Sequence, residues 1–300
     1  MTKFSLRLAI VAIGLAVFTG CISFQGDAVT ALPADQHSLN DLKANPVSNG
    51  SRPLTADEIS DRILDAEKRR KFKTESGAIF TFQRNVVIDE IKGKSKKYKT
   101  RTYQSFSDHR DPVLMLVDGK PPTPEEIEKD RKEIHKHQIR IMGRDELKEG
   151  TNHKGDSNLM VRNIEKHRDK FIPRLIGTEK VNGRPAYILQ LLPDPTKKFK
   201  DVLVNEAVKH MIIKFWVDQR EFQVAKSKIV LAHPMFVIGG LAATVKTFEV
   251  TACQKRLTKD IWADHRVTAK IEGRVLWNPR VIRFSSESTN FELLPKQTKP

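Results

Sequence analysis

The nine histidines are the first residues in this sequence to consider for metal chemistry. His135 and His137 are two positions apart, so on a helix their side chains point about 200° apart and cannot share an ion. The spacing His-Glu-x-x-His is absent, and His210, His233 and His265 have no partner that the sequence identifies. Two cysteines are too few for a thiolate cluster. We therefore expect neither a metal site nor a cofactor.

Nucleophilic chemistry has equally little support in the sequence. Gly-x-Ser-x-Gly, Ser-x-x-Lys and the Gly-x-x-x-x-Gly-Lys-Ser/Thr loop are all absent. Cys253 follows Val250, Thr251 and Ala252 in a strand-like run, which indicates a buried thiol rather than a nucleophile. Asp218 and Glu221 fall in a predicted tight turn, where a structural role is the better interpretation. We expect a protein that is not an enzyme.

Cys21 is the residue whose context carries a modification signal. Lys3 and Arg7 precede 11 uncharged residues at 8–18, a stretch too short to cross a bilayer but typical of a secretory signal. The following residues, FTGC at 18–21, resemble the lipobox of bacterial lipoproteins. This predicts a signal peptide at 1–20, an acylated (palmitate-bearing) Cys21 and a membrane anchor. Cleavage of an ordinary signal peptide after Ala31 is the alternative.

The net charge of the chain limits the classes of partner that it could bind. Removal of residues 1–20 would lower the formal net charge from +16 to +14. Nucleic acid would suit this charge, but an exported protein rarely meets it and no nucleic-acid-binding module is visible. Anionic lipid or acidic envelope polymers are more plausible partners, and a solvated basic surface is the simplest interpretation. The expected location is the bacterial cell envelope, as an outer membrane lipoprotein facing the periplasm, since Ile22 after the cysteine gives no inner-membrane retention signal.

The rest of the sequence divides into a tether and one domain. Residues 21–54 are rich in Gly, Pro, Asn and Ser and are interpreted as a flexible lipidated N-terminus, followed by a single domain at 55–300. Thr55 with Glu58 forms a capping box for a helix at 56–72. Thr123, Pro124 and Glu126 give the same signal for a helix ending near 142.

Between and after these helices the pattern is that of strands. Alternating runs bounded by turn residues predict strands at 78–87, 97–103, 113–117, 171–181, 184–192, 210–217, 222–232, 245–257, 262–277 and 280–292. A loop is expected at 143–157 and a short helix at 158–168. The predicted fold class is α+β, mainly β: a large curved antiparallel sheet, an incomplete barrel covered by a few helices.

Two segments carry a family resemblance. The stretch GTEKVNGRPAYIL at 177–189, followed by KFWVD at 214–218, resembles the hairpins of the LolA/LolB/RseB-like superfamily of outer membrane lipoprotein-sorting-like proteins. The resemblance implies an incomplete barrel whose helices, here 56–72 and 124–168, cover an apolar concave face that binds acyl chains. This chain departs from the soluble carriers in its predicted anchor and in its long polar helix at 124–142.

The resemblance also implies which residues bind. Candidates for the cavity lining are Phe80, Phe82, Met115, Ile188, Met211, Ile213, Phe215 and Val230, with Val113 and Val245 as further candidates. Lys92, Lys94, Lys96 and Lys97 could contact anionic head groups, although a solvated hairpin is the alternative. The apolar connection at 232–244 could be a mouth loop or a cover for the end of the barrel.

Three functions are compatible with this pattern. The first is an envelope lipoprotein that binds lipid or acylated protein in an apolar half-barrel cavity, in lipoprotein or lipid trafficking. The alternative is a non-enzymatic sensor or interaction module that binds a periplasmic protein partner. A structural envelope lipoprotein without a specific ligand is the third.

Overall fold

The computed structural model describes residues 52–75, 79–107, 111–142, 168–199, 202–237, 243–258 and 261–294. The expected signal peptide, Cys21 and most of the tether lie outside these ranges, as do the loop at 143–157 and nearly all of the helix at 158–168.

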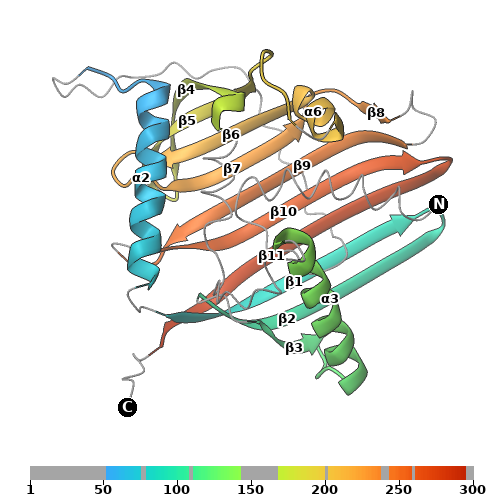
Figure 1. Ribbon diagram of the computed structural model, residues 1–300. Coiled ribbons are helices and arrows are strands. Elements are labelled where there is room, and N and C mark those ends of the chain that lie inside the picture. The colour runs from blue at the N-terminus through green and yellow to red at the C-terminus, as the bar shows by residue number, and fades with distance from the viewer. Residues whose placement is uncertain are drawn as a thin grey trace.

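One antiparallel sheet of 11 strands forms the body of the molecule (Figure 1). The order of its strands is β3-β2-β1-β11-β10-β9-β7-β6-β5-β4, with β8 paired to β9. The strands β3 and β4 end this order and do not pair with each other, so the sheet stays open. The predicted fold class, a mainly β protein with an incomplete barrel, is therefore confirmed. The strands are β1 (Phe80–Lys92), β2 (Ser95–Phe106), β3 (Val113–Val117), β4 (Phe171–Val181), β5 (Arg184–Pro193), β6 (Met211–Asp218), β7 (Val224–Leu231), β8 (Met235–Val237), β9 (Ala243–Arg256), β10 (Trp262–Val275) and β11 (Asn278–Leu293).

The two long helices begin at the capping boxes that the sequence predicts. In α2 (Ala56–Glu75) the amide of Thr55 donates to the Glu58 carboxylate at 2.8 Å, and the amide of Glu58 donates to the Thr55 hydroxyl at 3.2 Å. In α3 (Pro124–Met142) Thr123 and Glu126 make the same pair of bonds at 2.9 and 3.3 Å. These reciprocal bonds satisfy amides that the first turn of a helix leaves without partners.

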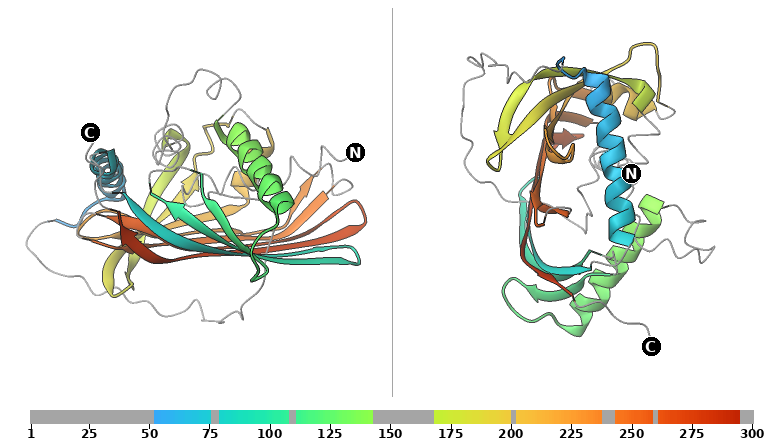
Figure 2. Two further views of the ribbon diagram at one scale, coloured as in Figure 1. Left: turned by 90° about the horizontal axis from the view of Figure 1, so that it is seen from below. Right: turned by 90° about the vertical axis from the view of Figure 1, so that its left-hand side faces the viewer.

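Both helices lie on the concave side of the curved sheet (Figure 2). Ile59 and Ile63 of α2 are buried and belong to the main core cluster, which otherwise consists largely of strand residues. The apolar stripe of α2 is therefore the surface that attaches it to the sheet. The opposite, convex face is mostly polar, with cross-strand pairs such as Lys228 with Glu249 at 2.7 Å and Arg266 with Glu287 at 2.7 Å.

Three local features differ from the sequence expectation. A helix, α6 (Val202–Lys209), precedes β6 and buries Ala207 and Val208 in the core. Its eight residues are too few to show helical periodicity in the sequence. The expected connection at 232–244 contains the short strand β8. A 3₁₀ turn, η1 (Arg168–Lys170), leads into β4.

Candidate functional site

The alternation of side chains along β6 shows which of them face the helices. Met211, Ile213 and Phe215 are alternate residues of β6 and belong to the same buried cluster as Ile59 and Ile63 of α2. Successive residues of a strand point to opposite faces of the sheet. These three candidate residues therefore line the concave face on the side that α2 covers.

An aromatic group extends this face along β1. Phe82 stacks on Phe291 with ring centroids 5.3 Å apart, and Phe80 lies 6.0 Å from each of those two rings. Phe82 alternates along β1 with Val86 and Ile88, which are members of the main core cluster. Phe80 and Phe82 are thus on the concave side, together with the three candidates from β6.

Ile188 and Val230 lie on the other face of the sheet. Ile188 pairs with Trp216 in the β5–β6 register and forms a separate buried cluster with it and Ala186. Val230 follows Ile229, a member of the main cluster, so its side chain points to the convex side. The structure does not bring these two candidates to the surface that the other five share.

Met115 is exposed and has no partner in the β2–β3 register. The pairing passes from Leu114 to Leu116 at a bulge, and Met115 is the extra residue between them. Of the two further candidates, Val245 belongs to the main core cluster and Val113 is exposed.

The four candidate lysines lie in and beside the β1–β2 turn. Gly93 and Lys94 make a two-residue turn, with Gly93 at a φ of 58°, so the strands reach further than the sequence suggests. Lys92, Lys94, Lys96 and Lys97 are all exposed. They lie at the end of the sheet, beyond the apolar residues of its concave face.

Arg84 is a charged residue on the concave side that the sequence analysis did not single out. It alternates with Phe82 and Val86 on β1, and its guanidinium carbon lies 5.2 Å from the centroid of the Phe82 ring. No hydrogen bond or ion pair joins Arg84 to another residue in the part of the chain that the structure describes. Burial lowers the pKa of its guanidinium, while Asp264 and Tyr103 nearby act in the opposite direction. The signal that could have revealed it is a single charge within an alternating apolar pattern.

A buried polar network fastens α3 to the sheet. The Asp130 carboxylate accepts a hydrogen bond from the Arg101 guanidinium at 2.7 Å and one from the Tyr103 hydroxyl at 2.9 Å. Glu133 lies 3.4 Å from the same guanidinium. Burial raises the pKa of Asp130, against the effect of the Tyr103 hydroxyl and Arg101. Burial also raises the pKa of Tyr103, so its phenol stays protonated and donates. This network connects α3 to β2 and holds the helix in place.

A second network fixes the β6–β7 turn, where Asp218 and Glu221 lie. Arg184 donates to Asp218 at 2.6 Å and to Glu221 at 3.1 Å. Glu221 also accepts from the Trp262 indole at 2.6 Å and pairs with Arg256 at 2.7 Å. Burial opposes ionisation of Asp218, but the hydrogen bonds from Arg184 and the turn amides hold its pKa below the usual range. Both carboxylates are thus occupied by structural partners.

The remaining candidates for chemistry are the Cys253 thiol and the side chains that could bind a metal ion. Burial raises the pKa of the half-buried Cys253 thiol, which is not in a disulfide. Within the described ranges, no three His, Cys, Asp or Glu side chains are grouped so that they could hold a metal ion. No helix in those ranges combines the length and the apolar character needed to span a membrane.

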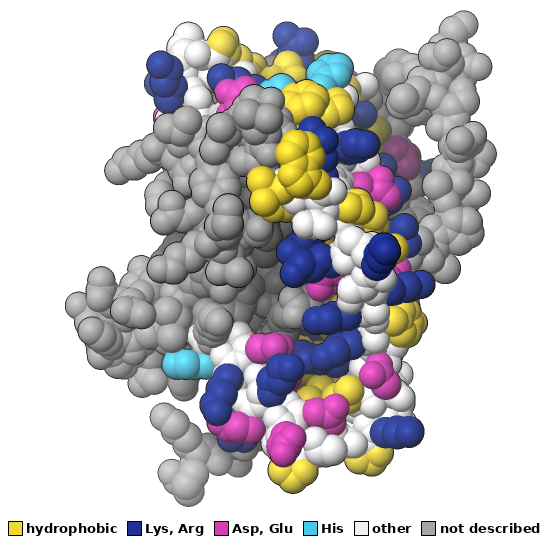
Figure 3. All heavy atoms as spheres, turned by 90° about the vertical axis from the view of Figure 1, so that its right-hand side faces the viewer, with side chains coloured by type: hydrophobic (Ala, Val, Ile, Leu, Met, Phe, Trp, Pro, Cys, Tyr) yellow, Lys and Arg dark blue, Asp and Glu magenta, His cyan; other side chains and the backbone are white. Residues whose placement is uncertain are grey.

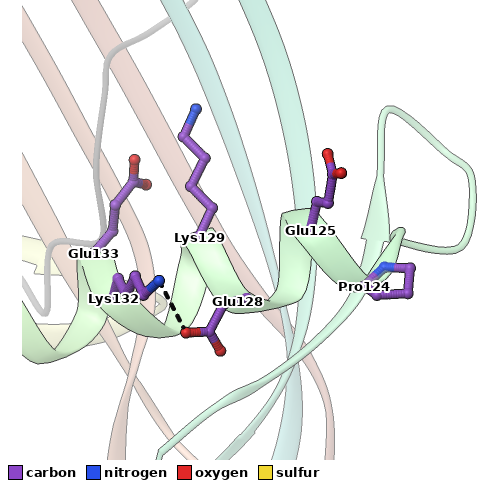
Figure 4. A pocket seen from close by; sticks show the side chains of 6 residues that line it. All are labelled: Pro124, Glu125, Glu128, Lys129, Lys132 and Glu133. Atoms are coloured by element: carbon purple, nitrogen blue, oxygen red, sulfur yellow. Dashed lines mark ion pairs between the residues drawn. The ribbon is translucent and has the colours of Figure 1, made fainter.

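An open depression beside α3 is a second concave feature (Figure 4). The described residues that line it all come from α3: Pro124, Glu125, Glu128, Lys129, Lys132 and Glu133. Lys132 pairs with Glu128, one turn earlier on the same helix, at 3.2 Å. Five of these six side chains are charged, whereas the side chains on the concave face of the sheet are mainly apolar.

Comparison with known proteins gives structural likenesses alone. The sequence matches no protein-family model and no curated protein. The chain is similar to a solved domain from Vibrio parahaemolyticus described as an outer membrane lipoprotein-sorting protein, with 11% identity and a TM-score of 0.33 over 80% of this chain and 94% of that one. It is similar to a LolA superfamily protein of Nitrosomonas europaea, with 12% identity and a TM-score of 0.28 over 81% and 95% of the two chains.

A third likeness is to the MucA/MucB complex of Pseudomonas aeruginosa, with 11% identity and a TM-score of 0.23 over 78% of this chain and 94% of that one. These TM-scores and identities are too low to transfer any activity, ligand or partner. Among the solved structures to which the chain is similar, one is thus described as a LolA superfamily protein.

Proposed function

We propose that this protein is a non-enzymatic envelope lipoprotein that binds the acyl chains of a lipid or of an acylated protein on the concave face of its sheet. The observation that carries the proposal is the apolar surface that β1, β6 and their neighbours present toward α2, on a sheet that does not close. Its members include Phe82, Ile213 and Phe215. The low structural likenesses carry none of this argument.

The physical basis of such binding is the transfer of methylene groups out of water. Each buried methylene contributes about 0.8 kcal/mol, so a long chain gains affinity without precisely placed polar contacts. On the side of β6 this surface is covered by α2, which begins next to the proposed tether at 21–54. A shift of α2 would expose that part of the surface to a chain.

The wider assignment follows from the N-terminal signals. In this proposal residues 1–20 are a signal peptide, Cys21 carries the lipid, and residues 55–300 are one binding domain. The protein would sit in the outer membrane, face the periplasm and take part in lipid or lipoprotein trafficking.

Native mass spectrometry of the full chain with Cys21→Ser, purified from a bacterial host, tests the proposal. We expect a stoichiometric adduct of lipid mass that organic extraction removes. Ile213→Glu, on the concave face, should abolish the adduct, whereas Ile212→Glu, one residue along β6 and on the opposite face, should retain it. A clean apo mass, unchanged after incubation with phospholipids and acylated peptides, would refute acyl-chain binding.

A photoreactive fatty acid provides a second measurement on the unsubstituted binding surface. Crosslinks should map to Met211, Phe215 and the Phe80–Phe82 region. Crosslinks spread over exposed residues of both faces would contradict a defined site, even if the Ile213 variant failed to fold.

A protein-binding module is the second candidate, and the edge strand β4 favours it. β4 ends the strand order, and Ile172, Leu175 and Ile176 on it are exposed. An edge strand with exposed apolar side chains can accept a strand from a partner. A photo-crosslinking residue at Ile176 should then trap one envelope protein that the same residue at exposed Lys255 does not trap; equal yields at both positions would count against this candidate.

A further inference from the structure

Two hairpin turns lie side by side at one end of the sheet, the right-hand end in Figure 1. They are residues 92–97 of the β1–β2 turn and residues 274–280 of the β10–β11 turn, together called the tip surface below. Lys92 pairs with Arg280 in the β1–β11 register, and the Gly93 amide donates to the Pro279 carbonyl at 3.0 Å. This bond holds the two turns at the same level, so they present one surface.

The tip surface exposes large apolar side chains. Trp277 is 80% exposed, although the other two tryptophans, Trp216 and Trp262, are only 7% and 5% exposed. Leu276 beside it is also exposed. Phe236 of β8 is 61% exposed and lies next to this surface, because both it and Arg274 pair with Thr244 of β9.

The charges of the tip surface have a single sign. Its two turns contain Lys92, Lys94, Lys96, Lys97, Arg274 and Arg280 and no carboxylate. Arg280 is paired with Glu90 at 3.3 Å, while the four lysines are exposed. Figure 3 looks onto this end of the molecule, where hydrophobic and basic side chains lie next to one another.

This combination has a specific physical meaning. Tryptophan places its apolar ring and polar N–H at the boundary between water and lipid, and lysines beside it reach anionic head groups. A convex pair of hairpin turns fits a flat bilayer better than it fits a partner that needs a groove. We infer that the tip surface docks on an anionic lipid bilayer, with Trp277 and Leu276 entering the head-group boundary and the lysines at head-group level.

This contact is distinct from acyl-chain binding and does not depend on it. The tip surface lies at the end of the strands, beyond the apolar residues that line the concave face of the sheet. It would add a second contact with a membrane to the anchor proposed at Cys21.

The fluorescence of Trp277 gives a direct test, because the two other tryptophans are already buried. The full chain carrying Cys21→Ser is mixed with vesicles of phosphatidylcholine alone or with a third of phosphatidylglycerol. We expect a blue shift of the emission on the anionic vesicles and quenching by lipids with brominated acyl chains. Both responses should disappear in Trp277→Phe, which keeps an aromatic ring at the tip.

A matched pair of triple variants tests the charges. Lys94→Ala, Lys96→Ala and Lys97→Ala together should weaken partitioning onto anionic vesicles by about 100-fold, since each lysine near such a surface contributes about fivefold. Lys129→Ala, Lys180→Ala and Lys255→Ala remove the same charge from exposed positions elsewhere and should change it by less than about threefold. The common Cys21→Ser background makes any contribution of the N-terminal residues equal in both.

Three outcomes would overturn the inference. They are equal binding to both vesicle types, equal losses in the two triple variants, and anionic binding with an unchanged Trp277 emission. The last would assign the contact to another surface, the second would assign it to the overall charge of the protein, and the first would leave an acidic protein as the better partner for the tip.

Discussion

The guanidinium of Arg84 faces the concave surface beside the Phe82 ring, with no ion-pair partner among the described residues. If an acyl chain lies on this surface, an anionic end of the same ligand would be favoured near that charge. Hydrogen bonds to a charged group contribute about 1.5–3 kcal/mol, which corresponds to at least a tenfold preference.

The first prediction compares a fatty acid with the fatty alcohol of the same chain length. The protein should bind the acid at least about tenfold more tightly, and Arg84→Met should remove most of this preference while the alcohol binds as before. Isothermal titration of both ligands against both proteins measures it. A preference that survives in Arg84→Met would show that another group receives the head of the ligand.

A second prediction for a single residue concerns Asp218 and the free energy of unfolding. Its folded-state pKa is lowered, so the unfolded state binds more protons in acid, and the stabilisation is lost as pH falls below about 4 toward the folded-state pKa. Asp218→Asn should lower the free energy of unfolding by about 2 kcal/mol at pH 7, because it removes the charge that Arg184 pairs with. The difference from wild type should shrink in acid, as urea unfolding from pH 7 to pH 3 would measure.

Glu128→Gln is the matched control for Asp218→Asn, since Glu128 pairs with Lys132 on the exposed side of α3. Exposed ion pairs contribute about 0–1 kcal/mol, so this variant should follow wild type closely at every pH. An equal loss of unfolding free energy in both variants would mean that the Asp218–Arg184 pair in the β6–β7 turn stabilises the fold no more than an exposed ion pair does.

At the scale of elements, the attachment of α3 depends on one buried carboxylate. Asp130→Ala leaves the buried Arg101 guanidinium without its nearest partner, and breaking such a pair costs about 3–5 kcal/mol. We expect the loss to appear first as local opening of α3, seen as faster hydrogen exchange of its amides. Glu133→Gln, which changes a more exposed group at 3.4 Å, should cost less than about 1 kcal/mol.

The close approach of β9 and β10 gives a second prediction for an element. A Cβ on Gly273 would overlap the carbonyl oxygen of Thr244, at the bulge where the β9–β10 register shifts. Gly273→Ala should therefore destabilise the fold by about 1–3 kcal/mol in thermal unfolding, as overpacking does. Gly119→Ala, at a φ of 78° but in open space, is the control that separates backbone strain from this overlap. Similar losses in both variants would argue against the overlap as the cause.

The elements also show how far sequence reasoning could reach. Both capping boxes were predicted because Thr55 with Glu58 and Thr123 with Glu126 are local signals, complete within four residues. The direction of side chains was not predicted for β5 and β6, because both faces of these strands bury apolar residues. Ile188 and Trp216 pack on the convex side as tightly as Ile213 does on the concave side. Periodicity cannot separate two apolar faces, and bulges such as the one at Met115 change the alternation without a mark in the sequence.

For the whole molecule, the order of the strands decides what holds the sheet together. β1 pairs with β11 along nearly its whole length. Among the described residues, β1, β2 and β3 therefore join the rest of the sheet through the last strand alone. The resemblance at 177–189 and 214–218 pointed to the curved sheet but not to this connection. Strand order depends on contacts between residues about 200 positions apart, which no local pattern records.

A truncation tests this dependence. A chain that ends after Trp277 lacks β11, and it should lose cooperative unfolding because the two parts of the sheet can no longer pair. A chain that ends after Leu294 loses only the last six residues and should unfold like the full protein. Unfolding of both chains in urea is measured by circular dichroism. Cooperative unfolding of the shorter chain would show that the two parts of the sheet are stable without the pairing through β11.

The pairing of β1 with β11 also sets a time order for folding. The strand near the start of the domain has to wait for its neighbour until the ribosome has finished nearly the whole chain, since these partners are joined by a very long loop. Until then β1, β2 and β3 cannot join β4 to β10, although each of these two parts can already pair within itself. The complete sheet therefore forms only when its last strand has been made, at the end of synthesis.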